Sequence, residues 1–154
     1  NENTFREAGI NHQWVQDNQS SSIYGVIRGL HYQTAPHAQT KLVRVLRGKI
    51  LDVVIDLRDG SPTYGRSFSI VLSAKNKKQL FIPKGFAHGF AVLSKRADVL
   101  YKCDTFYNKA SEKGIRYDDP NINIDWGILP EEIIVSEKDM LLGNLVDTKG
   151  DFSF

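Results

Sequence analysis

Short segments of alternating apolar and polar residues, each bounded by turn residues, constrain the fold of this chain more than any other feature of its sequence. The clearest case is KLVRVLRGKILDVVIDLRDGSPTYG, residues 41–65. Residues 41–46 and 49–57 alternate as β-strands do, and the dipeptide Arg47-Gly48 separates them. The segment therefore predicts two antiparallel strands joined as a hairpin.

This predicted hairpin also fixes which side chains share a face. Opposed residues of an antiparallel pair point to the same side of the sheet. A two-residue turn places Val43 opposite Asp52 and Lys41 opposite Val54. Lys41 and Asp52 then lie diagonally on one face, so the hairpin predicts two charged groups pointing into the same interior.

Several further segments show the same pattern. The strands expected from them are RSFSIVLS, QLFIP, a second hairpin within FAHGFAVLSKRADVLYKC that turns at residues 94–97, and a shorter hairpin in NINIDW. Helical patterning is confined to residues 4–8 and 137–142 near the two ends. The chain is therefore expected to be all-β, an antiparallel jelly-roll barrel with short peripheral helices.

The second predicted hairpin places a histidine and a tyrosine on one face. A four-residue loop pairs His88 with Cys103 and Phe90 with Tyr101. His88 and Tyr101 then share a face with apolar side chains. Burying a polar group on an apolar face destabilises the fold unless the group has a hydrogen-bond partner or serves a function. Both residues are therefore candidates for a functional site.

Composition excludes several classes of protein. The 154 residues fit one domain, and a formal charge of +2 is too small to indicate a nucleic-acid partner. No apolar run approaches the roughly 20 residues of a membrane span, so no membrane partner is expected. The single cysteine, Cys103, cannot form an intramolecular disulfide, which favours a reducing, cytoplasmic location.

The stretch IRGLHYQ, residues 27–33, sets an arginine and a histidine in an otherwise apolar strand. Strict alternation puts Arg28 and His31 on opposite faces. A glycine inside a strand often marks a β-bulge, which re-aims the residues that follow it. Gly29 therefore predicts a bulge that turns Arg28 and His31 toward the same site.

Five motifs carry a resemblance to a known family. In this order along the chain they are VIRGLHYQ, KLVRVLRGKILDVVIDLRDGSPTYG, LFIPKGFAHGFAVLS, YKCDTFYNKASEKGI and SEKD. Together they resemble the dTDP-4-dehydrorhamnose 3,5-epimerases, the RmlC family of the cupin superfamily. The resemblance implies a cupin jelly roll, a homodimer, and inversion of C3 and C5 of a dTDP-4-keto-6-deoxyhexose with no metal and no organic cofactor.

Epimerisation beside a ketone needs a base, a stabiliser of the enolate oxygen, and an acid on the opposite face. His31 suits the base because an ordinary imidazole is largely neutral at pH 7, and the resemblance places the base at this position. Tyr101 suits the acid because a phenol keeps a transferable proton. Without the motifs, each would be read as a buried core residue with a satisfied polar group.

Two further polar residues match family positions near the reacting sugar. Lys41 offers a cation to the developing enolate, and its alternative interpretation is a solvated lysine at a sheet edge. His88, from GFAHGF, resembles a second histidine that contacts substrate. Its alternative is a buried histidine bonded to a neighbour.

Asp139 resembles the carboxylate that partners the base and holds one imidazole tautomer. A local interpretation competes with this one, because Ser136 followed three residues later by an acid is close to the capping box of a helix start. Asp52 is a second candidate for the partner carboxylate, since it is expected to point into the same interior.

No P-loop and no Gly-x-Gly-x-x-Gly segment is present, so side chains must bind the nucleotide. Arg28 can hold a phosphate through two hydrogen bonds. The residues that the resemblance assigns to substrate binding are Gln16, Asp17 and Asn18 from VQDN, together with Glu112, Lys138 and Tyr107, the last as an aromatic that stacks on thymine.

Departures from the family pattern leave other functions open. The single domain at residues 1–154 lacks the amino-terminal segment usual in relatives, and Phe106 replaces a common tyrosine, which bears on the balance between C3 and C5 chemistry. A metal cupin needs a His-x-His pair, but Tyr32 follows His31. Two competing functions are a C3-only epimerase or ketoisomerase on a dTDP-4-keto-6-deoxyhexose, and a sugar-binding cupin without enzymatic activity.

Overall fold

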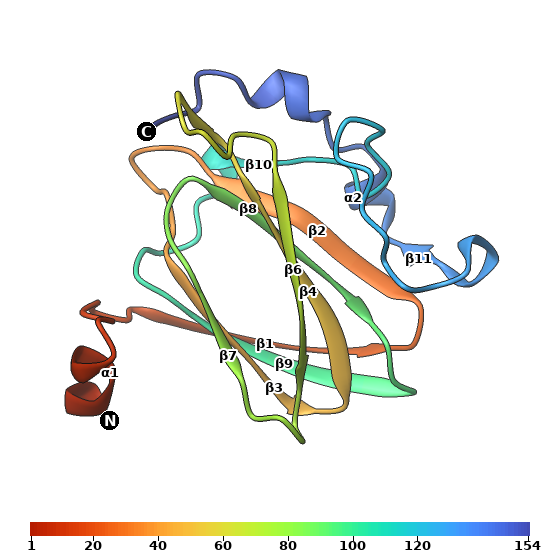
Figure 1. Cartoon of the computed structure of the whole chain (residues 1–154), viewed down its shortest axis with the longest axis horizontal. Coiled ribbons are helices and arrows are strands. Elements are labelled where there is room, and N and C mark those ends of the chain that lie inside the picture. The colour runs from red at the N-terminus through yellow and green to blue at the C-terminus, as the bar shows by residue number, and fades with distance from the viewer.

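Two facing β-sheets form the body of the protein in the computed structural model, which describes residues 1–154 (Figure 1). The smaller sheet has the strand order β1 (Gln16–Ile23), β9 (Arg96–Cys103), β3 (Lys41–Arg47) and β7 (Gln79–Ile82). The larger sheet has the order β10 (Glu112–Gly114), β2 (Val26–Gln33), β8 (Phe86–Val92), β4 (Lys49–Asp56) and β6 (Ser67–Ser73), with β11 (Ile134–Val135) added parallel to β2. The all-β, two-sheet architecture predicted from the sequence is confirmed.

Short elements lie around the two sheets. They are the helices α1 (Glu2–Glu7) and α2 (Glu137–Met140), the 3-10 turns Lys109–Ser111, Pro130–Glu132 and Leu145–Thr148, and the small parallel pair β5 (Arg58–Asp59) and β12 (Phe152–Ser153). Both helices fall where helical patterning predicts them. Figure 1 shows α1 standing away from the sheets, whereas α2 lies beside β2.

The predicted hairpin between residues 41–46 and 49–57 is wrong, although both strands exist. β3 lies between β9 and β7, and β4 lies between β8 and β6 in the other sheet. Lys41 pairs with Cys103 and Ile82 rather than with Val54. The chain crosses from one sheet to the other at Gly48, where φ is +78°. Alternation predicts which side chains face inward, but it carries no information about which strand lies alongside.

The second predicted hairpin is wrong for the same reason. β8 belongs to the larger sheet and β9 to the smaller one, so His88 pairs with His31 and not with Cys103. The expected common interior survives this correction, because His88 and Tyr101 line the same cavity. The shorter hairpin in NINIDW is absent, since residues 121–126 form a turn and irregular structure.

The long strand β1 was not predicted, and neither were the short strands β5, β10, β11 and β12. β1 has the sequence QDNQSSSI, which lacks the run of β-branched and aromatic residues that favours strands. Its backbone nevertheless pairs with β9 along all eight residues. Pairing with a complete neighbouring strand outweighs this low propensity, and it brings Gln16 and Asn18 to the inner face.

The apolar core is divided between the two faces of the larger sheet. One cluster fills the space between the sheets, and its members include Val43, Val54, Phe90 and Val99. The other cluster contains Ile27, Leu30, Val53 and Ile55 together with Ile115, Trp126 and Leu145 from the segment after β10. This segment therefore covers the outer face of the larger sheet. Burial on both faces explains the nearly continuous apolar run in β4.

The bulge predicted at Gly29 is confirmed. The register between β2 and β8 shifts between Arg28 and His31, and Gly29 has a φ of +109°. A Cβ atom at Gly29 would lie 2.7 Å from the Cα atom of Gly89 and 2.7 Å from the carbonyl oxygen of His88. Only glycine fits this conformation and this approach, and both Arg28 and His31 line one cavity as a result.

A buried carboxylate at the end of β4 is expected to be important for stability. Asp56, only 1% exposed, accepts hydrogen bonds from the Arg58 guanidinium at 2.9 and 2.8 Å, from Ser61 Oγ at 2.6 Å and from Thr63 Oγ1 at 2.7 Å. Burial acts to raise the pKa of Asp56, but these hydrogen bonds hold it well below its ordinary value. The ionised form is therefore the one that stabilises the fold.

Asp56→Asn should lower the free energy of unfolding by about 3 kcal/mol at neutral pH, because the Arg58 charge loses its buried partner. A depressed folded-state pKa gives stability that is complete above the unfolded-state pKa and is lost as the pH falls toward the folded-state value. The difference in free energy of unfolding between wild type and variant should then decrease below about pH 4. Urea unfolding at several pH values measures it, and a difference that is constant with pH would contradict this assignment.

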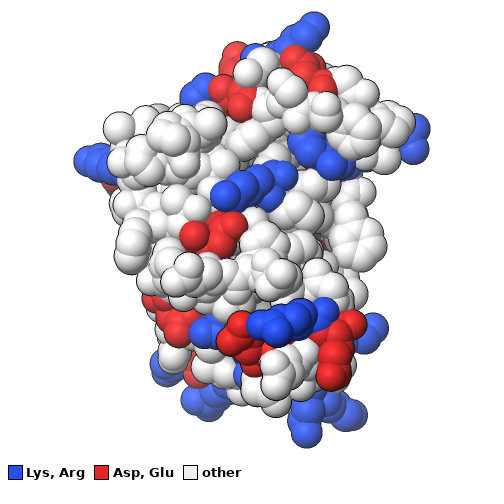
Figure 2. Space-filling model, turned by 90° about the vertical axis from the view of Figure 1, so that its left-hand side faces the viewer, with Lys and Arg blue, Asp and Glu red and all other residues white.

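The surface gives little sign of a charge-driven partner on the face drawn in Figure 2. Basic and acidic side chains are interspersed there, and uncharged residues form most of the middle of that face. No helix in the structure has the length and apolar character required to cross a membrane.

Candidate active site

Two cavities of about 240 and 290 Å³ hold nearly all the residues that the sequence analysis assigned to a site. Four residues line both cavities, namely His31, Lys41, Tyr101 and Glu112. The first cavity adds Gln16, Asn18 and Tyr107, and the second adds Arg28, His88, Lys138 and Asp139. The shared residues show that the two cavities adjoin.

A histidine–aspartate pair stands at the bulge of β2. His31 Nε2 lies 2.8 Å from Asp139 Oδ1, and Asp139 Oδ2 accepts from the backbone N–H of Gly29 at 3.1 Å. Burial acts to raise the pKa of Asp139, but the hydrogen bond and charge of His31 lower it below its ordinary value. The ionised carboxylate of Asp139 can only accept a hydrogen bond, so the proton of a neutral His31 ring is on Nε2. Nδ1 of His31 is therefore the basic nitrogen.

Asp139 lies at a capped helix start and its carboxylate also contacts His31. Ser136 caps α2, because its side chain accepts from the backbone N–H of Asp139 at 3.1 Å. The cap uses the backbone of Asp139, so its carboxylate remains available to His31. A four-residue helix between β11 and the chain's last segment thus delivers a side chain to β2.

A second histidine–aspartate pair lies on the neighbouring strands. His88 Nε2 contacts both carboxylate oxygens of Asp52, at 2.9 and 3.1 Å, and the two side chains are almost fully buried. His88 is directly opposite His31 in the register of β2 and β8. Asp52 therefore orients His88, while the carboxylate next to His31 is that of Asp139.

Tyr101 and Lys41 enter the cavities from the opposite sheet. Burial raises the pKa of the Tyr101 hydroxyl, so the phenol keeps its proton at neutral pH. Burial lowers the pKa of the Lys41 ammonium, although the neighbouring Cys103, Asp52 and Glu112 act in the opposite direction. Lys41 Nζ lies 5.9 Å from the centre of the Tyr101 ring. The pair places a proton donor and a cation in a partly dehydrated space.

A chain of polar contacts borders the cavities near β10. Lys138 Nζ lies 2.7 Å from both carboxylate oxygens of Glu112, and the Tyr107 hydroxyl donates to Glu112 Oε2 at 2.8 Å. Burial acts to raise the pKa of Glu112, but the hydrogen bonds from Lys138 and Tyr107 hold it below its ordinary value. Arg28 Nε donates to Ser22 Oγ at 3.0 Å. The site thus combines cations, an acid and an aromatic ring.

Two residues singled out in the sequence lie apart from both cavities. Asp17 points to the outer face of β1, where its carboxylate accepts from Lys102 Nζ at 2.9 Å. This placement follows from alternation along β1, which turns Gln16 and Asn18 inward and Asp17 outward. Phe106 is 65% exposed and lines neither cavity.

Sequence reasoning missed several polar residues that line the cavities, among them Ser20, Gln33 and Gln39. Alternation along a strand would have found Gln33, because β2 was predicted, but not Ser20, because β1 was not. Ser20 follows Asn18 by two residues in β1, and Gln33 follows His31 by two residues in β2, so each shares the inner face of its strand.

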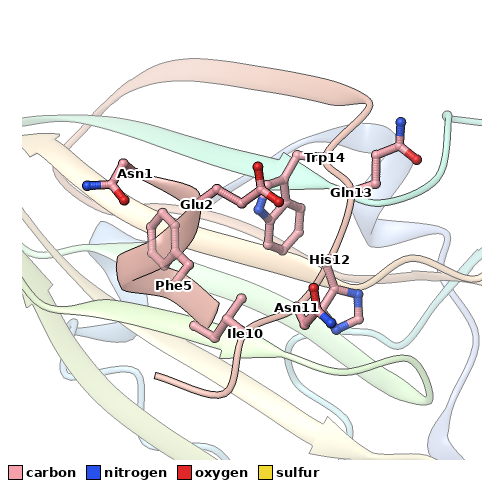
Figure 3. Close-up of a pocket in the computed structure, with 8 residues that line it drawn as sticks. All are labelled: Asn1, Glu2, Phe5, Ile10, Asn11, His12, Gln13 and Trp14. Atoms are coloured by element: carbon pink, nitrogen blue, oxygen red, sulfur yellow. The ribbon is translucent and has the colours of Figure 1, made fainter. Parts of the chain in front are cut away.

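The hollow of about 610 Å³ in Figure 3 lies elsewhere, between α1 and residues 10–14. Its lining includes the rings of Phe5 and Trp14, and its ionisable side chains are Glu2 and His12. It contains no paired acid and base. No group of three or more His, Cys, Asp or Glu side chains is placed to hold a metal ion anywhere in the chain.

Comparison with known proteins agrees with the geometry. The family model described as dTDP-4-dehydrorhamnose 3,5-epimerase matches residues 1–147. The Shigella flexneri protein of that name is 49% identical over 148 residues, which is 96% of this chain and 81% of the relative. The structure of the enzyme from Elizabethkingia anophelis NUHP1 has a TM-score of 0.91 at 48% identity, covering 99% of this chain and 82% of that one.

A second solved structure carries a bound sugar nucleotide. It is the RmlC epimerase from Legionella pneumophila Philadelphia 1 in complex with dTDP-4-keto-L-rhamnose, with a TM-score of 0.91 and 45% identity over 100% of this chain and 84% of that one. The resemblance inferred from the five motifs is thus confirmed, and so is the cupin-type jelly roll. This chain belongs to the dTDP-4-dehydrorhamnose 3,5-epimerase family.

Proposed function

We propose that this protein inverts C3 and C5 of dTDP-4-dehydro-6-deoxy-D-glucose to give dTDP-4-dehydro-L-rhamnose. One observation carries the proposal. His31, with its partner Asp139, projects from the larger sheet, and Tyr101 projects from the smaller sheet into the same cavity. A sugar ring lying between the sheets has a base on one side and an acid on the other, which is what inversion requires.

The reaction begins with removal of a proton from a carbon beside the C4 ketone. Nδ1 of His31 takes the proton, and the C–H electron pair moves to form an enolate with its charge on the C4 oxygen. Asp139 stabilises the imidazolium that forms. Tyr101 then donates its phenolic proton to the opposite face of the carbon. Exchange with solvent returns a proton to Tyr101 and removes one from His31, and the second carbon reacts in the same way.

Lys41 stabilises the developing charge on the C4 oxygen. Its ammonium lines both cavities and is partly dehydrated, so its field is weakly screened. One preorganised donor of this kind contributes about 3 kcal/mol to stabilising a transition state. His88, fixed by Asp52, is a further polar side chain beside the sugar, from the same sheet as His31.

The remaining residues bind the nucleotide. Tyr107 is 51% exposed beside the first cavity, which suits an aromatic ring that stacks on thymine. Arg28 and Lys138 line the second cavity and supply positive charge for the diphosphate. Gln16 and Asn18 offer amide groups between these two regions. The placement of Asp17 on the outer face gives it no part in this binding.

Incubation with dTDP-4-keto-6-deoxyglucose in D₂O tests the proposed reaction, with deuterium located by NMR. The expected result is exchange and inversion at both C3 and C5. Exchange at C3 alone would instead indicate a C3-only epimerase, and a ketoisomerase product would indicate a ketoisomerase. Binding of the sugar nucleotide without any exchange would leave only a sugar-binding cupin.

Asp139→Asn should lower kcat by about 100-fold or more, because a neutral amide no longer fixes the His31 tautomer that leaves Nδ1 basic. Binding of dTDP should change little, since the Asp139 carboxylate bonds His31 and the Gly29 N–H rather than the cations assigned to the diphosphate. Steady-state kinetics and calorimetric titration with dTDP separate the two effects. Asp17→Asn, on the outer face of β1, is the matched control and should keep full activity. An Asp139→Asn variant with normal kcat would contradict the pairing.

The protein is further proposed to be a homodimer. The smaller sheet has two open edges, β1 and β7, and a free strand edge is stabilised by pairing with another chain. Helix α1 also stands away from the sheets (Figure 1) and has no buried residue. Sedimentation at micromolar concentration should give the mass of two chains, and a monomer would contradict the proposal.

A cytoplasmic location is also proposed. The support for it is that Cys103 is the one cysteine in the chain, is buried, and is not in a disulfide.

A further inference from the structure

The segment that carries Tyr107 has little packing of its own. Residues 104–108 follow β9 with no regular secondary structure. The two aromatic side chains in its centre are largely exposed, Phe106 at 65% and Tyr107 at 51%. Apolar burial therefore does not fix this backbone, and segments of this kind are mobile unless polar contacts hold them.

A single buried side chain bridges the two residues on either side of Tyr107. Gln33, only 4% exposed, lies at the end of β2 on the same face as His31. Its Nε2 donates to the carbonyl oxygen of Phe106 at 3.3 Å, and its Oε1 accepts from the backbone N–H of Asn108 at 2.6 Å. Nε2 also donates to the carbonyl oxygen of His37 at 2.7 Å. The amide thus makes three hydrogen bonds, all to backbone.

The neighbouring polar groups fix the direction of this bridge. Asn108 Oδ1 accepts from the backbone N–H of Ala110 at 2.9 Å, so its NH₂ group faces His37 Nε2 at 3.3 Å. His37 Nδ1 then donates to Ser111 Oγ at 2.9 Å. Because each group has a partner of the correct kind, the network has one arrangement, and buried networks of this type are rigid.

The same network directs the ring of Tyr107 toward the cavity. The Tyr107 backbone N–H donates to Gln16 Oε1 at 2.8 Å, and its hydroxyl donates to Glu112 Oε2 at 2.8 Å. Glu112 is the β10 residue paired with Gln33 in the strand register. The ring is therefore held at its hydroxyl and along its backbone by residues whose relative positions the sheet determines.

We propose that Gln33 is a positioning residue for nucleotide recognition, which acts by holding Tyr107 in the orientation that receives the base. This inference rests on the proposed function, in which Tyr107 stacks on thymine. Gln33 makes no hydrogen bond to His31 and does not line the second cavity, which holds Arg28, His88 and Asp139. Its loss should therefore weaken nucleotide binding and raise KM, while kcat at saturating substrate stays close to that of wild type.

The experiment measures binding of dTDP by calorimetry in a double-mutant cycle of Gln33→Met and Tyr107→Ala. Methionine keeps the length and volume of glutamine and removes all three hydrogen bonds. Each single variant should weaken binding about tenfold, Gln33→Met because backbone groups lose a buried partner and Tyr107→Ala because the stacking ring is removed. The double variant should bind no more weakly than Tyr107→Ala alone, because Gln33 acts through Tyr107. Gln79→Leu, at an exposed glutamine of β7, is the matched control and should bind as wild type does.

Two results would overturn the inference. The first is an unchanged dTDP affinity in Gln33→Met. The second is that Gln33→Met weakens dTDP binding by the same factor in wild type and in Tyr107→Ala. Gln33→Glu serves if the methionine variant does not fold, since it keeps the acceptor for Asn108 and loses both donated bonds, and the same cycle applies to it. If wild type does not bind dTDP, or Tyr107→Ala binds it normally, the nucleotide assignment in the proposed function fails instead.

Discussion

His31→Ala should abolish both epimerisation and exchange of carbon-bound hydrogen with D₂O. General-base catalysis contributes about 10²- to 10⁴-fold to a rate, and the proposed function assigns proton removal to His31 and only a contact with the sugar to His88, the other histidine of the cavities. Proton removal is the first step, so every later event is lost with it. Deuterium incorporation followed by NMR measures the loss, and normal exchange would remove His31 from the base role.

The control for this variant is His12→Ala. His12 packs against Trp14 and Phe81 on the side of the molecule near α1 and lines neither active-site cavity. It should retain full exchange. His31→Ala should also still bind dTDP, since the substitution leaves Tyr107 and Gln16 in place. Loss of dTDP binding in His31→Ala would show that the variant disrupts the site rather than the proton transfer.

Tyr101→Phe should separate proton removal from inversion. The substitution keeps the ring that packs between the sheets and deletes only the hydroxyl. His31 can still form the enolate and return a solvent-derived proton to the face from which it was taken. We therefore expect deuterium incorporation with retained configuration, and an epimerised product reduced by about 100-fold or more. Chiral analysis of the recovered sugar nucleotide, together with NMR, measures both quantities.

The matched control is Tyr24→Phe, which removes an exposed hydroxyl that donates to Glu132 at 2.9 Å outside the cavities. It should invert both carbons normally. Normal inversion by Tyr101→Phe would take the acid role away from tyrosine. Loss of exchange as complete as in His31→Ala would mean that the hydroxyl is needed already for proton removal.

The sequence predicted which face of a strand each side chain occupies more reliably than it predicted which strands pair with one another. The inward positions of His88 and Tyr101 follow from the two-residue period of a strand, which depends only on local sequence. Strand partners depend on how the whole chain crosses between sheets, and the crossing at Gly48 looks like a tight hairpin turn when only its own residues are considered. The strands of the two long predicted hairpins were therefore right, and both of their registers were wrong.

Polar residues were harder to interpret for a different reason. β1 is stabilised by β9 beside it, so its serines and amides give no local signal of a strand. Asp139 lies 108 residues from His31 along the chain, and the pairing depends on where α2 docks. The bulge at Gly29 could be predicted because its signal is local. Arg28 and His31 are three residues apart, and they can face one site only if the strand between them is irregular.

The position of Asp139 in the chain has a consequence for the order in which a newly made molecule becomes competent. The residues of all strands up to β10 are synthesised by Gly114, so His31 is made well before the α2 residue that orients its imidazole. β11 then adds to β2 and carries Ser136 and Asp139 to the bulge. A nascent copy without α2 therefore has an unoriented imidazole and lacks Leu145, which packs on the outer face of the larger sheet, so full proton-transfer activity depends on synthesis of this last segment.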